Sequence, residues 1–372
     1  MVFGSLILLF FYGQIPCQGA SIEKEESWEQ IEDLGLDEVE DAVDQLLDEK
    51  VSIREMTAEI LDSGQILDGA LWKKVAKESI WSALGVQKEN CMHILVLVLL
   101  SSVLYYLSDV FRESSIGEIA FYMVYVLLFV LLLKSFDQLA EQLEGLLEGI
   151  TVFMKALLPS YYIALTAAGG AATAAVFYQM ILLLILLTEQ VLLQWILPAV
   201  RMYLVLELIN FLTKEEFLSK MTELLKNVIV WAMKSMIGLI VGMQLIQRLI
   251  APALDMFRQS MIGKTAEVLP GVGNLFSGIT EVVVGAAVLI KNCLGAAAII
   301  ILLLAAVGPL LRIGCSSLVY QVLAAVVQPI TDKRMVGCIH TMGESLGMLV
   351  RILLTVEILF LLTIAIVAGS LS

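Results

Sequence analysis

The sequence has little of the chemistry that enzymes and nucleic-acid-binding proteins use. Its 372 residues include two histidines, five cysteines and seven prolines. The basic residues form no patch that could follow a phosphate backbone, which excludes nucleic acid as a partner. The cysteines stand at wide spacings in or beside apolar segments, which excludes a disulfide framework. The expected topology separates the two Cys-x-His pairs, so we predict no metal and no cofactor.

Catalytic motifs also fail on inspection. Gly343-Glu344-Ser345-Leu346-Gly347 matches the nucleophile-elbow string, but that elbow follows a strand, and this string opens an apolar helical run. Gly263-Lys264-Thr265 lacks the glycine that a phosphate loop needs five residues before Gly263, where Arg258 stands. We therefore expect a protein without enzymatic activity, in which Gly343 and Gly347 serve helix packing.

Apolar residues, by contrast, are abundant at 59% of the chain. About 20 consecutive apolar residues suffice to cross a bilayer, and several runs approach or exceed that length. The pattern predicts an all-α, polytopic membrane helix bundle over residues 91–372 with about seven transmembrane helices. The expected crossings are residues 91–110, 119–136, 150–168, 176–197, 228–250, 281–311 and 346–368.

The segments between these runs set the expected boundaries. Residues 137–149 are acidic and are expected to be an amphipathic linker, and Pro198 and Gly308-Pro309 are expected to end helices. Residues 199–212 are short for a crossing. Residues 313–330 are expected to be re-entrant or interfacial, because this places Arg312 and Lys333-Arg334 on the same cytoplasmic side.

The first 90 residues differ from the rest. Residues 1–20 resemble a signal peptide without basic residues at its start, and an uncleaved anchor is the alternative. Residues 21–90 are expected to be an extracytoplasmic, acidic and amphipathic helical region, with 16 acidic and three basic residues between positions 23 and 62. Leu36, Val39 and Val43 follow helical spacing, and Ser52 with Glu55 forms a capping-box pattern. This region is either a solvated segment or an arm that docks on a partner.

Polar residues inside the apolar runs are the candidate functional residues. Charges at membrane depth are costly, so they indicate either a hydrated path or ion pairs that join helices. Small residues let neighbouring helices approach closely in lipid. The polar candidates are Lys155, Glu189, Arg201, Glu207, Lys234, Lys291, Asn292 and Glu357. The packing candidates are Gly238, Gly242, Gly285, Gly295, Gly343 and Gly347.

Several stretches together carry a family resemblance. They are Lys155-Ala-Leu-Leu-Pro-Ser160, Ala167-Ala-Gly-Gly-Ala-Ala-Thr173, Ile262-Gly-Lys-Thr-Ala-Glu-Val-Leu-Pro-Gly-Val-Gly273, Val288-Leu-Ile-Lys-Asn-Cys-Leu-Gly295 and Gln328-Pro-Ile-Thr-Asp-Lys-Arg334. In content and order they resemble the stage III sporulation protein AE family, and the resemblance covers nearly the whole chain, although the signal peptide departs from the family in having no basic residues at its start.

The resemblance implies a multi-pass protein of the mother-cell membrane around the forespore. It implies a non-enzymatic subunit of a secretion-like channel complex needed for late forespore development. The implied partners are the other stage III A-operon proteins, including an ATPase, and stage II sporulation protein Q. Membrane lipid and a second copy of the chain are further expected partners. The alternative function is a stand-alone secondary transporter, which the charges at depth and the proline-interrupted runs would suit.

Overall fold

The computed structural model describes residues 36–47, 52–63, 85, 88, 91–100, 102–103, 114–168, 171–212, 218–266 and 273–369. The expected signal peptide and much of residues 21–90 lie outside these ranges. The described elements are helices, which confirms the all-α fold. The labelled ones are α3 (Asp37–Leu46), α4 (Ile53–Ser63), α6 (Ser114–Ala167), α7 (Ala171–Leu186), the π-helix η1 (Leu187–Ile196), α8 (Leu197–Leu212), α9 (Ser219–Ala266), α10 (Gly273–Val327) and α11 (Lys333–Gly369). A short apolar helix also covers Cys91–Leu100.

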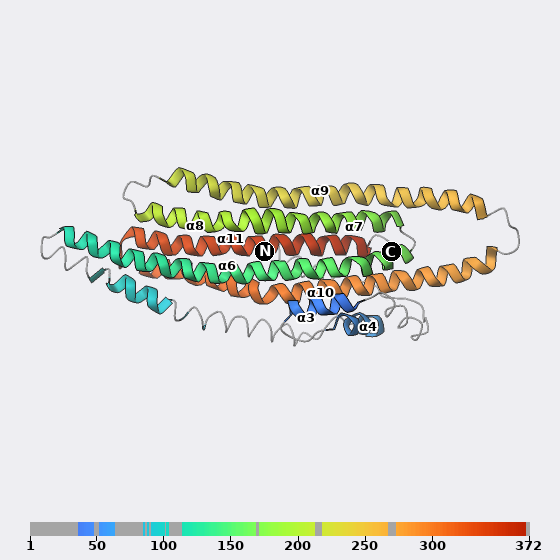
Figure 1. The fold of residues 1–372 in the computed structure, drawn as a ribbon, viewed down its shortest axis with the longest axis horizontal. Coiled ribbons are helices and arrows are strands. Elements are labelled where there is room, and N and C mark those ends of the chain that lie inside the picture. Colours follow the sequence, from blue (N-terminus) through green and yellow to red (C-terminus); the bar gives the residue numbers. More distant parts are fainter. Residues whose placement is uncertain are drawn as a thin grey trace.

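The long helices lie side by side in an elongated antiparallel bundle (Figure 1). α9 forms one edge and packs against α7, α8 and α11. α11 lies inside the bundle and makes its most extensive contact with α10, which also packs against α6. α3 and α4 cover the edge opposite α9, where α3 packs against α6 and α4 packs against α10.

Two of these helices are far longer than a bilayer requires. α6 has 54 residues and α10 has 55, so each extends about 80 Å at the usual helical rise, against a hydrocarbon core of about 30 Å. The described residues contain five helices long and apolar enough to cross a membrane. They are Phe121–Ala167, Ala174–Leu212, Ser219–Met243, Ala287–Val327 and Lys333–Ala365. The expected count of about seven crossings is not confirmed.

The acidic linker expected at 137–149 is wrong, because α6 passes through it without a break. Leu139, Leu143 and Leu147 are buried on one side of the helix. The acidic side chains take the other side, and most of them are exposed. An amphipathic segment with this spacing continues a helix as well as a uniformly apolar one does, so 119–136 and 150–168 belong to one element.

The breaks expected at Pro198 and Pro309 are also wrong. α10 runs through Pro309, so residues 313–327 continue this helix and do not form a separate re-entrant segment. Pro198 lies near the start of α8, directly after the π-helical stretch. There the Leu197 N–H donates to the Leu192 carbonyl, five residues back. Proline has no backbone N–H, so it removes one hydrogen bond from the helix. The wider π-helical turn before it accommodates this loss, and the helix continues past Pro198.

The apolar positions of the N-terminal pattern are buried where the structure describes them, while an extracytoplasmic segment over residues 21–90 stays a prediction. Leu36, Val39 and Val43 are fully buried. α4 begins where expected, with the Glu55 N–H donating to Ser52 Oγ at 3.2 Å. The apolar side of these helices packs on the chain's own bundle, so this surface is used within the molecule.

Candidate functional site

Three of the eight candidate polar residues, Lys155, Glu189 and Arg201, form ion pairs that join different helices. The first pair links α6 to the π-helix, with Lys155 Nζ 2.5 Å from Glu189 Oε1. The two side chains are 49% and 35% exposed, so the pair lies at the bundle surface. π-helical turns often occur at functional positions, and this one presents Glu189 toward α6. The structure thus brings together two residues that the sequence suggested separately.

The second cluster joins α8 and α10 to α6. Arg201 Nη2 lies 3.0 Å from Glu144 Oε2, and its Nε lies 3.8 Å from Asp137 Oδ1. Both acids belong to the segment that was expected to be a linker. One turn away, Arg312 of α10 donates to Gln142 Oε1 at 3.3 Å. The middle of α6 is therefore a polar seam to which two other helices attach.

The third cluster was missed by sequence reasoning and centres on Glu344 of α11. Both of its oxygens lie 3.0 Å from Lys226 Nζ of α9. The Tyr203 hydroxyl of α8 donates to Oε2 at 3.2 Å, and His340 Nε2 lies 4.0 Å from Oε1. One carboxylate thus joins three helices. A signal was present in the sequence, since Glu344 stands inside the Gly-x-x-x-Gly string of an apolar helix, where a charge requires a partner.

The remaining interior candidates are more deeply buried. Lys291 is completely buried, and its Nζ donates to the Ala368 carbonyl at 3.2 Å, so this side chain faces protein. Glu357 is 1% exposed, and neither of its carboxyl oxygens has a hydrogen-bond partner among the described residues. The same holds for Asn292 Oδ1 and for Glu207 Oε2. Buried polar atoms of this kind are unusual, and Glu357 is the one with both oxygens affected.

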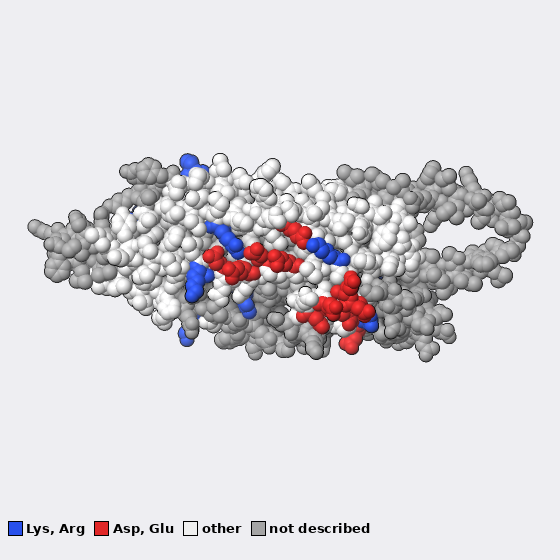
Figure 2. All heavy atoms as spheres, in the orientation of Figure 1, with Lys and Arg blue, Asp and Glu red and all other residues white. Residues whose placement is uncertain are grey.

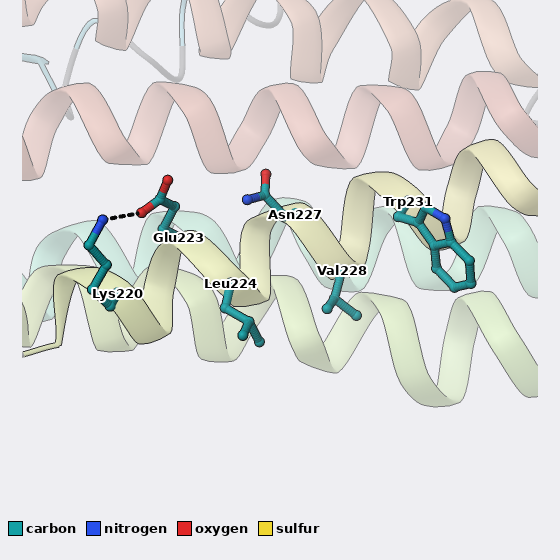
Figure 3. Close-up of a pocket in the computed structure, with 6 residues that line it drawn as sticks. All are labelled: Lys220, Glu223, Leu224, Asn227, Val228 and Trp231. Carbon is teal, nitrogen blue, oxygen red and sulfur yellow. Dashed lines mark hydrogen bonds and ion pairs between the residues drawn. The ribbon is translucent and has the colours of Figure 1, made fainter.

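Lys234 of α9 is exposed like Lys155, but unlike Lys155 it forms no ion pair within the described chain. No described acid lies within ion-pair distance of it. The same helix carries the surface drawn in Figure 3, which is an open strip and not an enclosed cavity. All of its lining residues come from α9, including Lys220 and Glu223, which pair at 2.9 Å, and the exposed Trp231. An open strip on a single helix offers no enclosed site for a small molecule.

The packing glycines divide into two groups. A Cβ on Gly343 would lie 2.8 Å from Gln321 Cγ and 3.1 Å from the Ser317 carbonyl oxygen, so α10 and α11 are in close contact there. A Cβ on Gly295 would lie 2.8 Å from the Tyr161 hydroxyl, and one on Gly347 would make an ordinary 3.6 Å contact with Ser317 Oγ.

The other three glycines have open space around them. A Cβ on Gly238, Gly242 or Gly285 would meet no described atom within 4 Å. They do not serve packing within the described chain, and a role in contacts with another chain stays a prediction.

Taken together, these contacts hold helices to one another. On the face shown in Figure 2, positive and negative side chains alternate along the middle of the bundle, and an acidic group lies at α3 and α4. Within the ranges that the structure describes, no group of three metal-ligating side chains gathers.

Comparison with known proteins agrees with the resemblance seen in the sequence. The model of the family "Stage III sporulation protein AE" matches residues 51–370. A protein of that name from Bacillus subtilis (strain 168) is 25% identical over 283 residues, which cover 75% of this chain and 71% of the relative. No solved structure matches the chain.

Proposed function

Because the chain belongs to the stage III sporulation protein AE family, a role in sporulation follows, and we propose that this role is that of a non-enzymatic membrane subunit. The subunit belongs to a secretion-like channel complex that connects the mother cell and the forespore. It lies in the mother-cell membrane around the forespore and supports late forespore development. Its partners are the other stage III A-operon proteins, including the ATPase, and stage II sporulation protein Q on the forespore side.

The interhelical ion pairs are the observation that carries this proposal. Lys155–Glu189, Arg201–Glu144 and Lys226–Glu344 each bridge two helices at 2.5–3.0 Å. Charges used in this way stabilise one arrangement of long helices, as a structural subunit requires. A carrier that rocks around a central site would have to break any of these pairs that joins its two moving parts.

Purification from sporulating cells tests the proposal. The tagged full-length chain is extracted in mild detergent after chemical cross-linking, and its cross-linked peptides are identified by mass spectrometry. We expect cross-links to other stage III A-operon proteins. A matched sample from vegetative cells that express the same tagged chain controls for adventitious association. Recovery of a lone monomer from both samples would count against the proposal.

One observation favours the alternative, a stand-alone secondary transporter. Glu357 is buried in a candidate membrane span, and neither of its oxygens has a hydrogen-bond partner in the part of the chain that the structure describes. Intramembrane carboxyls of this kind bind protons or cations in carriers. Purified protein reconstituted into vesicles tests this function. Solute uptake by this chain alone, abolished by Glu357→Gln, would support the transporter and argue against a purely structural subunit.

A further inference from the structure

The α3–α4 hairpin packs against the bundle through apolar side chains. Val39 and Val43 of α3 and Ile53 of α4 are fully buried, with α3 packed on α6 and α4 on α10. Leu46 approaches α6 so closely that a Cβ on Gly149 would lie 3.0 Å from Leu46 Cδ1. Buried apolar side chains therefore hold the hairpin against the side of the bundle.

The hairpin is also held in its own shape by polar bonds. Ser52 Oγ donates to Glu40 Oε1 at 2.6 Å, and Arg54 Nη2 lies 2.9 Å from Asp37 Oδ1. Its outer side is acidic and exposed. The exposed acids there are Asp37, Glu38, Asp41, Asp44 and Glu55.

The position of the hairpin conflicts with lipid on that side. Figure 1 shows α3 and α4 alongside α10, between the ends of the bundle and not beyond them. Gly149 and the part of α10 that α4 covers both belong to long helices that include candidate membrane spans. On insertion scales an aspartate at the centre of a membrane helix costs about 2.5 to 3.5 kcal/mol, so the five acids cannot face hydrocarbon wherever this part of the bundle lies within the bilayer.

The acids of α6 lie on the same face as the hairpin. Figure 2 shows the acidic group of α3 and α4 and the charged row along the middle of the bundle on one side of the molecule. Glu141 and Glu148 of α6 are exposed, and within the described chain neither forms an ion pair. Exposed, unpaired carboxylates require water.

The opposite edge has the reverse character. Between residues 219 and 245, α9 exposes Leu224, Val228, Trp231, Leu239 and Leu245, each at least 50% exposed. Its exposed charges there are Lys220 and Glu223, which pair with each other, and Lys234, whose long side chain can extend toward the membrane surface. Only a lipid environment or an apolar partner suits such a surface.

From this contrast we propose that the side of the bundle formed by α3, α4 and the acidic seam of α6 borders a water-filled passage within the membrane-spanning assembly, while α9 faces lipid. The proposal rests on the proposed function and specifies it, because it assigns the side of this subunit that lines the conduit. The hairpin acts as a permanent hydrophilic cover on helices that would otherwise present apolar surface to water.

Substituted-cysteine labelling of the full-length chain tests the proposal. Asp41→Cys on α3 and Glu148→Cys on α6 are compared with Val228→Cys and Leu239→Cys on α9, in broken membranes from sporulating cells that expose both membrane faces. A membrane-impermeant charged thiol reagent reacts with the thiolate, and apolar surroundings such as lipid raise the thiol pKa and so suppress the thiolate. The two α9 positions stand 11 residues apart, about 16 Å along the helix, so they sample different depths. The unsubstituted chain gives the background from its own cysteines.

We expect the hairpin and α6 positions to react at least tenfold faster than both α9 positions. Equal or slower reaction would overturn the proposal. Protection in membranes that is lost after detergent dissociates the complex would also overturn it, because a partner protein would then cover this face. Labelling does not depend on which proteins co-purify. A lone monomer in the cross-linking experiment would therefore refute the proposed function while these rates remained informative.

Discussion

Replacement of Gly343 by alanine tests the contact between α10 and α11 most directly. The new methyl group would lie 2.8 Å from Gln321 Cγ, 3.1 Å from the Ser317 carbonyl oxygen and 3.2 Å from the Gln321 backbone nitrogen. Two of these three atoms belong to the backbone of α10, so a side-chain rotation cannot relieve the clash. The Ser317 hydroxyl also donates to the Gly343 carbonyl at 2.7 Å, which ties the two helices together at this point.

The magnitude follows from two opposing effects. Alanine favours a helix over glycine by about 1 kcal/mol. Overpacking a tight contact costs about 1 to 3 kcal/mol. The matched control is Gly238→Ala on α9, where the methyl group would meet no described atom within 4 Å and the propensity gain alone applies. We therefore expect Gly343→Ala to be less stable than Gly238→Ala by about 1 to 3 kcal/mol.

The assay is unfolding of the two purified variants in the same detergent, followed by helical circular dichroism and compared with the unsubstituted chain. Gly347→Ala serves as an internal reference, since its methyl group would make an ordinary 3.6 Å contact and should behave like the control. A Gly343→Ala variant as stable as Gly238→Ala would refute the inferred closeness of α10 and α11.

Three further experiments test the ion pairs and the buried lysine. In a double-mutant cycle, Lys226→Gln and Glu344→Gln should show a coupling of about 0.5 to 1 kcal/mol in detergent unfolding, as partly exposed pairs do; additive effects would show that the contact contributes nothing. Lys155→Glu should lower the amount of folded protein in membranes, and adding Glu189→Lys should restore it by re-forming the pair, whereas failure of the exchange would argue against a direct contact. Lys291→Leu should insert normally, because a central lysine costs about 2.5 to 3.5 kcal/mol on insertion, but should lower the yield of heat-resistant spores; normal spore formation would remove this lysine from the function.

The spacing of residues along the sequence correctly predicted those features of the fold that depend on residues close together in the chain. The apolar spacing of Leu36, Val39 and Val43 predicted the buried side of α3, and Ser52 with Glu55 predicted the start of α4. These succeed because helical periodicity and capping involve residues only three or four positions apart. The same reasoning was wrong to place helix ends at prolines and acidic stretches. Pro309 lies within the continuous helix α10, and the acids of residues 137–149 lie on the side of α6 that is not buried.

The sequence by itself determined that this is a helical protein with membrane-length apolar runs, that several charges lie inside those runs, and that the chain resembles one sporulation family. Tertiary structure alone decided how these charges are paired. Lys226 and Glu344 are 118 positions apart, and their contact depends on the order of α9, α8 and α11 in the bundle. The tertiary structure also decided that Gly343 is crowded and Gly238 is not, because the atoms around a helical glycine belong to other helices that are distant in sequence. Periodicity reveals which side of a helix is buried, but only the assembled bundle supplies the neighbour.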